Sequence, residues 1–213
     1  MICAICEKRP AKRFCPAKGE KICAVCCGTG RESTIDCLPD CTYLLSAHRY
    51  EAEHRPPPGE AQIAFPDIAV PPEFLHERWP LVAEIASAIV AFQMRNPDLR
   101  DPGVLAVLES LAEAYRTLVS GIYFERPPAA PLLHALYTRV IDCLREFRAS
   151  AASRPGFPAL RDRDIFYILI FLLRLASQHG NGRPLSRAFL GFLREQFPLP
   201  AEQPAEAPRI ILP

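Results

Sequence analysis

Eight of the nine cysteines in this chain lie between Cys3 and Cys41, and no other feature constrains the fold as strongly. Their spacing reads C-x2-C-x8-C-x7-C-x2-C-C-x9-C-x3-C. This segment has too few apolar residues to build a hydrophobic core, so another interaction must order it. Two C-x2-C pairs in a short segment indicate a tetrahedral site of four thiolates, which suits zinc. Metal binding then provides the folding free energy.

Disulfide bonds are the alternative explanation for so many cysteines. The N-terminus, MICAICEKRP, has neither the basic start nor the apolar run of a signal peptide. The longest fully apolar stretch, Ile165 to Leu173, is much shorter than the roughly 20 residues of a membrane span. We therefore expect a cytoplasmic protein without a membrane segment. In that reducing compartment, clustered cysteines are more often metal ligands than disulfides.

Eight cysteines suit two structural zinc ions that share the segment. The first ion is assigned to Cys3, Cys6, Cys23 and Cys26, and the second to Cys15, Cys27, Cys37 and Cys41. The ligands of the two sites alternate along the chain, so neither site closes without the other half of the segment. For the fourth position of the second site His48 is the rival of Cys27, although an exposed histidine on a helix face is the simpler interpretation. A single metal ion is a further alternative, whereas the spacing matches no iron–sulfur motif.

The stretch CAICEKRPAKRFCPAKGEKICAVC resembles a B-box-type zinc finger. That family uses paired ligands, then a cysteine after an aromatic residue, then an aliphatic residue before Cys-x2-Cys. Phe14-Cys15 and the segment from Ile22 to Cys26 stand at the matching places. The resemblance implies that the first ion is held by the two C-x2-C pairs and that Cys15 belongs to the second ion.

The resemblance covers about 24 of the 213 residues and then departs from the family pattern. Lys18 stands where the family has an aspartate ligand, and Cys37 and Cys41 replace its closing histidine pair. The chain also resembles a group of bacterial zinc-finger proteins that carry ICxxCCGT followed by DCxYL, which implies a fold but no activity. Because B-boxes are mostly protein-interaction modules, the resemblance favours a role in protein binding.

Composition divides the chain into four parts. We expect a zinc-binding module at 1–55, a semi-rigid proline-rich linker at 56–72, a helical domain at 73–197 and a flexible tail at 198–213. Helical periodicity predicts five helices near 73–95, 101–121, 130–150, 162–180 and 184–197, joined by short loops in an up-down bundle. A further helix is expected over TYLLSAHRYEAEH, residues 42–54. The predicted class is mainly α, with a small N-terminal binuclear zinc module before an all-α helical bundle.

Three features of the helical domain carry separate expectations. The fourth predicted helix is apolar on nearly all sides before Arg174, so we place it centrally and expect that arginine to reach the surface. If Arg174 is buried, it needs an acidic partner, for which the candidates are Glu109, Glu113 and Asp142. We expect Cys143 to be a small core residue, and the segment GIYFERPP, residues 121–128, to be a loop packed on the core.

The sequence contains no recognisable catalytic motif. It has no histidine–glutamate zinc motif, nucleophile elbow or glycine-rich phosphate loop. A catalytic zinc keeps one position open for water, whereas four thiolates fill the site and make a poor Lewis acid. We therefore expect a non-enzymatic adaptor or regulator that binds another protein. The bundle is expected to hold a partner helix or a second copy of the chain, as a homo-oligomer.

Two other classes of function are alternatives. A zinc-dependent nucleic-acid-associated regulator would use the basic strip at residues 8–13. The formal net charge of +1 and the lack of interleaved aromatic residues do not favour it. A thiol-based redox or metal sensor would use Cys27 as its switchable ligand.

Overall fold

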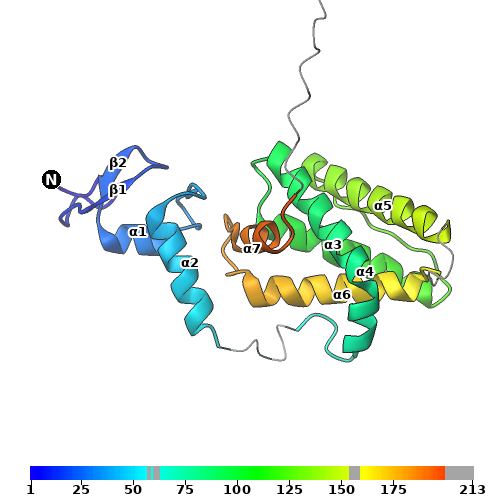
Figure 1. Cartoon of the computed structure of the whole chain (residues 1–213). Coiled ribbons are helices and arrows are strands. Elements are labelled where there is room, and N and C mark those ends of the chain that lie inside the picture. The colour runs from blue at the N-terminus through cyan, green and yellow to red at the C-terminus, as the bar shows by residue number, and fades with distance from the viewer. Residues whose placement is uncertain (57–58, 60–62, 154–158, 200–213) are drawn as a thin grey trace, which may run out of the picture.

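The computed structural model describes residues 1–56, 59, 63–153 and 159–199. Within these ranges the chain forms seven α-helices and one two-stranded antiparallel sheet. The predicted class, a small cysteine-rich N-terminal region followed by a helical bundle, is confirmed, and Figure 1 shows the two beside each other. Part of the expected linker and residues 200–213 of the expected flexible tail lie outside the described residues.

The cysteine-rich region is built from a short hairpin and two helices. Strands β1 (Arg13–Cys15) and β2 (Glu20–Ile22) pair so that Cys15 lies opposite Glu20. The turn between them places Gly19 at φ +68°, a conformation that glycine adopts without strain. Helices α1 (Ala24–Gly30) and α2 (Thr42–His54) follow. The bounds of α2 agree with the prediction, whereas the hairpin and α1 were not predicted from the sequence.

Five helices form the bundle, as the periodicity predicts. They are α3 (Pro72–Arg95), α4 (Asp101–Val119), α5 (Pro131–Ala152), α6 (Asp162–His179) and α7 (Ala188–Gln196). Proline stands in the first turn of α3, α4 and α5, where its missing N–H costs no helical hydrogen bond. Helix α3 also has a proline in its interior, Pro80.

Helix α6 lies at the centre of this bundle. It packs most extensively against α4 and also against α3 and α7, while α5 packs on α3 and α4. Its buried apolar residues point to several sides of the helix: Ile165, Phe166, Ile168, Leu169, Ile170, Leu172 and Leu173. Each such side chain contributes about 1.5–3 kcal/mol when fully buried, so this helix holds the others together. No helix within the described ranges is long and apolar enough to cross a membrane.

Arg174 corrects the expectation made for it. It is half-buried, and no ion pair joins it to Glu109, Glu113 or Asp142. Its guanidinium instead donates to three backbone carbonyls of residues 64–68. The distances are 3.1 Å to Ala64, 2.6 Å to Phe65 and 2.7 Å to Ile68. Ala64, Phe65 and Ile68 also pack against the bundle core. This part of the expected linker is therefore attached to the bundle.

The segment at residues 121–128 also differs from its prediction. Ile122, Tyr123 and Phe124 are exposed instead of packed on the core. The backbone of the segment is nevertheless attached to α4, because the Thr117 hydroxyl donates to the Phe124 carbonyl at 3.2 Å. Cys143 is a buried core residue, as expected.

Candidate metal centre and the polar junction beside it

Two tight turns bring the first set of predicted ligands together. Cys3 and Cys6 lie in the opening turn of the chain, which closes where the Glu7 amide donates to the Cys3 carbonyl at 2.9 Å. Cys23 directly follows β2 and Cys26 lies in the first turn of α1. The opening turn is held against β2 because the Ala4 amide donates to the Lys21 carbonyl at 3.2 Å. Both C-x2-C pairs thus face the same point.

The sulfur atoms of Cys3, Cys6, Cys23 and Cys26 all lie within 4.8 Å of one another. The Cys6 and Cys23 sulfurs are 4.0 Å apart. Four sulfurs at about 2.3 Å from a tetrahedral zinc ion are separated by about 3.8 Å, so the cluster is close to the required size. All nine cysteines are free thiols. The ligand set assigned to the first ion is therefore assembled in the fold.

The backbone around this cluster stabilises negative charge on sulfur. The Cys23 amide donates to the Cys3 sulfur at 3.1 Å, and the Cys26 amide donates to the Cys23 sulfur at 3.3 Å. Burial raises the pKa of Cys3, but hydrogen bonds from backbone amides outweigh it and lower that pKa to about 6. The hydrogen bond from the Cys26 amide lowers the pKa of Cys23 in the same way.

Cys26 shows the opposite effect. Its hydrogen bond with the Cys23 sulfur, followed by burial, raises the pKa of Cys26 to about 12. The cluster thus favours thiolates at some sulfurs and retains a proton at another, because adjacent negative charges repel each other. A divalent cation supplies the positive charge that lets all four sulfurs ionise. The donor set therefore fits a metal that prefers thiolates.

The second set of predicted ligands is spread over four elements. Cys15 ends β1, Cys27 lies in α1, Cys37 lies in the following loop and Cys41 directly precedes α2. Burial raises the pKa of Cys37, and the nearby charges of Cys41 and Cys15 act in the same direction. Among the described residues, however, the first cluster is the one group of potential ligand atoms within 4.8 Å of one another. The second zinc site stays a prediction.

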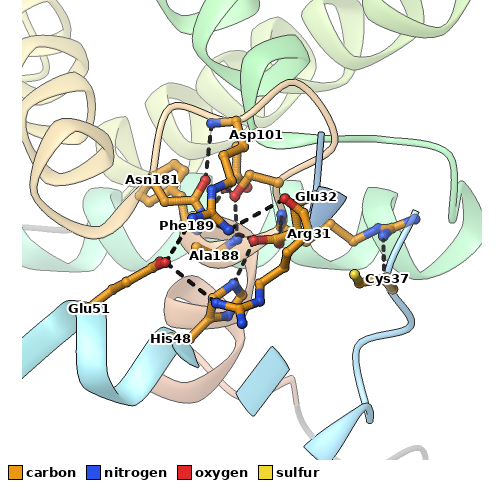
Figure 2. A network of polar contacts seen from close by, with 12 residues as sticks. Arg31, Glu32, Cys37, His48, Glu51, Asp101, Asn181, Ala188 and Phe189 are labelled. Atoms are coloured by element: carbon orange, nitrogen blue, oxygen red, sulfur yellow. Dashed lines mark hydrogen bonds and ion pairs between the residues drawn. The ribbon is translucent and has the colours of Figure 1, made fainter. Parts of the chain in front are cut away.

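His48 corrects a further expectation. It is half-buried instead of exposed, and its Nε2 lies 2.8 Å from the Glu32 carboxylate. Figure 2 shows this contact at the centre of a network that joins the cysteine-rich region to the bundle. We call this network the polar junction and define it by Glu32, Asp36, His48, Glu51, Asn181, Arg183 and Arg187.

Glu32 is the centre of the polar junction. It is only 1% exposed, and its carboxylate accepts from His48, from the Asn181 amide at 2.7 Å and from the Arg187 backbone at 3.2 Å. Its own carbonyl accepts from the Leu185 amide at 2.9 Å. Burial raises the pKa of Glu32, but the hydrogen bond and charge of His48 outweigh it and hold the pKa below its ordinary value. A buried carboxylate thus connects α2 to the loop before α7.

The local backbone places Glu32 at this point. The Gly30 carbonyl accepts from the amides of residues 33, 34 and 35, which forms a tight turn at the end of α1. A Cβ atom at Gly30 would lie 2.9 Å from Ile35 Cδ1, so a larger residue there would require the Ile35 side chain to move. Glu32 itself has φ +50°, which is uncommon for a residue with a side chain.

Two further carboxylates strengthen the polar junction. Asp36 lies 2.7 Å from the Arg100 guanidinium and 3.0 Å from that of Arg187. Glu51 of α2 lies 3.0 Å from Arg183 and 3.8 Å from Arg31. These contacts join residues up to about 150 positions apart, so no local sequence pattern indicates them.

No known protein family, curated protein or solved structure matches this chain. The resemblance to a B-box finger therefore stays a prediction. What the structure supports is its central element, a cluster of four cysteines that is able to hold a metal ion.

Proposed function

We propose that this chain is a zinc-binding, non-enzymatic adaptor or regulatory protein that acts through protein–protein interaction. The observation that carries the proposal is the cluster of Cys3, Cys6, Cys23 and Cys26 in a region with a very small apolar core. An all-sulfur donor set favours zinc over harder cations, and four thiolates complete its coordination. The role of the ion is therefore structural.

The proposal includes a second structural zinc ion held by Cys15, Cys27, Cys37 and Cys41. Its support is electrostatic: Cys37 lies close enough to Cys15 and Cys41 for their charges to raise its pKa. Cys27 directly follows Cys26, a residue of the first cluster, so one short helix would contribute to both sites.

Exposed apolar side chains support the adaptor role. Ile5 and Val25 are exposed, and each directly precedes the second cysteine of a C-x2-C pair. Ile122, Tyr123 and Phe124 are exposed in the bundle, in the segment between α4 and α5. Apolar groups that a folded protein leaves in water often mark contacts with a partner. The polar junction joins the two regions that carry these groups.

Metal analysis of the purified chain tests the zinc part of the proposal. We expect two zinc ions per wild-type chain, at most one in Cys6→Ser and at most one in Cys37→Ser. Cys143→Ser is the matched control, because Cys143 is buried in the bundle core, and it should keep both ions. A Cys6→Ser protein that keeps all its zinc would contradict the first site. One ion in the wild type would contradict the second site alone.

Site-specific photocrosslinking in living cells tests the adaptor part. A photoreactive phenylalanine analogue replaces Tyr123, which is exposed, and in a control it replaces Arg145 of α5, which is also exposed. We expect a discrete protein adduct at position 123 that is absent at position 145. Adducts with nucleic acid, or none at position 123, would argue against this use of the segment.

A further inference from the structure

We propose that a cavity between the cysteine-rich region and the bundle binds a small anion that carries phosphate or carboxylate groups. The cavity has a volume of about 560 Å³ and is lined by α2 on one side and by α6 and α7 on the other. Cavities of this size at the boundary between two structural units are typical of small-molecule sites. A ligand here is additional to the proposed zinc and adaptor function.

The floor of the cavity is apolar and close to α7. Leu44 of α2 and Leu190 of α7 line it and are buried, and Gly191 lies beside them. A Cβ atom built on Gly191 would meet no atom within 4 Å, so the space above this part of α7 is open. The floor thus offers room and apolar contact for the carbon skeleton of a ligand.

The charged groups of the wall are predominantly cationic. Arg49, Arg55, Arg187 and Arg194 line the cavity together with two histidines, whereas Glu51 and Glu195 are its acidic residues. The charge of Glu51 is already balanced from outside the cavity, by Arg31 and Arg183. Arg187 is likewise paired with Asp36 and His48 with Glu32, which leaves Arg49, Arg55 and Arg194 against Glu195. The cavity therefore has a surplus of positive charge.

The free cations lie on both sides of the opening. Arg49 and Arg194 are exposed, and neither forms an ion pair or hydrogen bond with another described residue. Arg55 donates to the Gln178 carbonyl, a neutral partner. Guanidinium groups bind phosphate and carboxylate through paired hydrogen bonds. Cations that face one another across a concave surface concentrate a positive potential inside it.

His179 lies close enough to Arg55 to be affected by its charge. Its ring stacks on Phe192, with centroids 3.5 Å apart, and it lines the same cavity. Burial lowers the pKa of His179, and the charge of Arg55 lowers it further. Only the second of these causes reflects the positive charge of the wall, and it acts in the direction expected where an anion is stabilised.

Calorimetric titration of the zinc-loaded full chain with two separate probes, inorganic phosphate and glutarate, tests the site. The double variant Arg49→Gln/Arg194→Gln removes one cation from each side, and Arg145→Gln on α5 is the control. We expect saturable binding of at least one probe to the wild type. The affinity for that probe should fall about tenfold in the double variant, because each charged hydrogen bond contributes to binding. In the control the affinity should stay within about twofold of the wild type.

The two probes separate the sources of the anionic group. Binding of phosphate alone assigns phosphorylated ligands, binding of glutarate alone assigns carboxylates, and binding of both supports the shared chemistry. The inference is overturned if neither probe saturates below about 10 mM, or if the double variant binds as tightly as the control. Zinc is counted in every sample, so failure of the cavity is distinguishable from loss of the zinc module. If the double variant loses zinc, the single variant Arg194→Gln replaces it.

Discussion

Replacing Glu32 with glutamine is the sharpest test of the polar junction. The carboxylate accepts three hydrogen bonds, two at Oε2 from His48 and Asn181 and one at Oε1 from the Arg187 amide. A glutamine side chain of the same shape presents one acceptor oxygen and one NH₂ group. If the oxygen takes the Oε2 position, the NH₂ group faces the N–H of Arg187. In the opposite orientation the NH₂ group faces the Asn181 amide, and only the His48 tautomer with its proton on Nδ1 can accept from it.

The magnitude follows from these contacts. Glu32 is 1% exposed, so water cannot replace a lost partner. One buried donor left unsatisfied costs about 1–3 kcal/mol, and two charged hydrogen bonds become weaker neutral ones. We expect Glu32→Gln to lower the free energy of unfolding by about 2–3 kcal/mol. With a urea m-value of about 2 kcal/mol/M, the midpoint falls by about 1 M or slightly more.

Urea unfolding at pH 7, followed by far-UV circular dichroism, measures this shift. Glu53→Gln is the matched control, because Glu53 lies on α2 but is exposed, and it should change the free energy of unfolding by about 0.5 kcal/mol or less. Zinc content is compared in all three proteins, so that a loss of metal is not mistaken for a loss of the junction. Equal midpoints for the two variants, at equal zinc content, would refute the assignment of Glu32 as a buried link.

Two further predictions concern the bundle. Arg174→Met removes three hydrogen bonds to the carbonyls of residues 64–68. It should therefore speed amide hydrogen exchange in that segment at least about tenfold, measured by mass spectrometry, with unchanged exchange arguing against the attachment. Burial raises the pKa of Cys143 to about 11. At pH 8 only about one thiol in a thousand is then ionised, so iodoacetamide should leave Cys143 unmodified for hours in the folded protein and alkylate it within minutes after denaturation. Alkylation should accelerate with each pH unit toward 11, and rapid labelling at pH 8 would contradict its burial.

The helices of the bundle were predictable because their signals are local. Proline in the first turn and apolar residues at helical spacing indicate α3, α4 and α5 without reference to the rest of the chain. The pairing of the two C-x2-C motifs was predictable for a chemical reason, since four thiolates need one common cation.

Other features depend on contacts that sequence reasoning does not reach. Helix α1 has the sequence AVCCGTG, which favours helix poorly, and it begins where the Cys23 sulfur accepts from the Cys26 amide. From the sequence alone, Glu32 would be expected to be a solvent-exposed loop residue. Its burial depends on contacts with Asn181 and Arg187, which are distant in the sequence. Arg174 was expected to need an acidic partner if buried, but backbone carbonyls satisfy it, and any residue type provides those.

The loop from Gly30 to Cys37 carries a predicted zinc ligand and also two carboxylates of the polar junction. If Cys37 holds metal, one short segment has to satisfy two sets of constraints at once. Thermodynamic reciprocity then follows: whatever free energy the bundle gains from a metallated loop, the metal gains from the bundle. An isolated N-terminal fragment would accordingly bind its second ion less tightly than the intact chain. Removal of the metal would in turn lower the stability of the bundle.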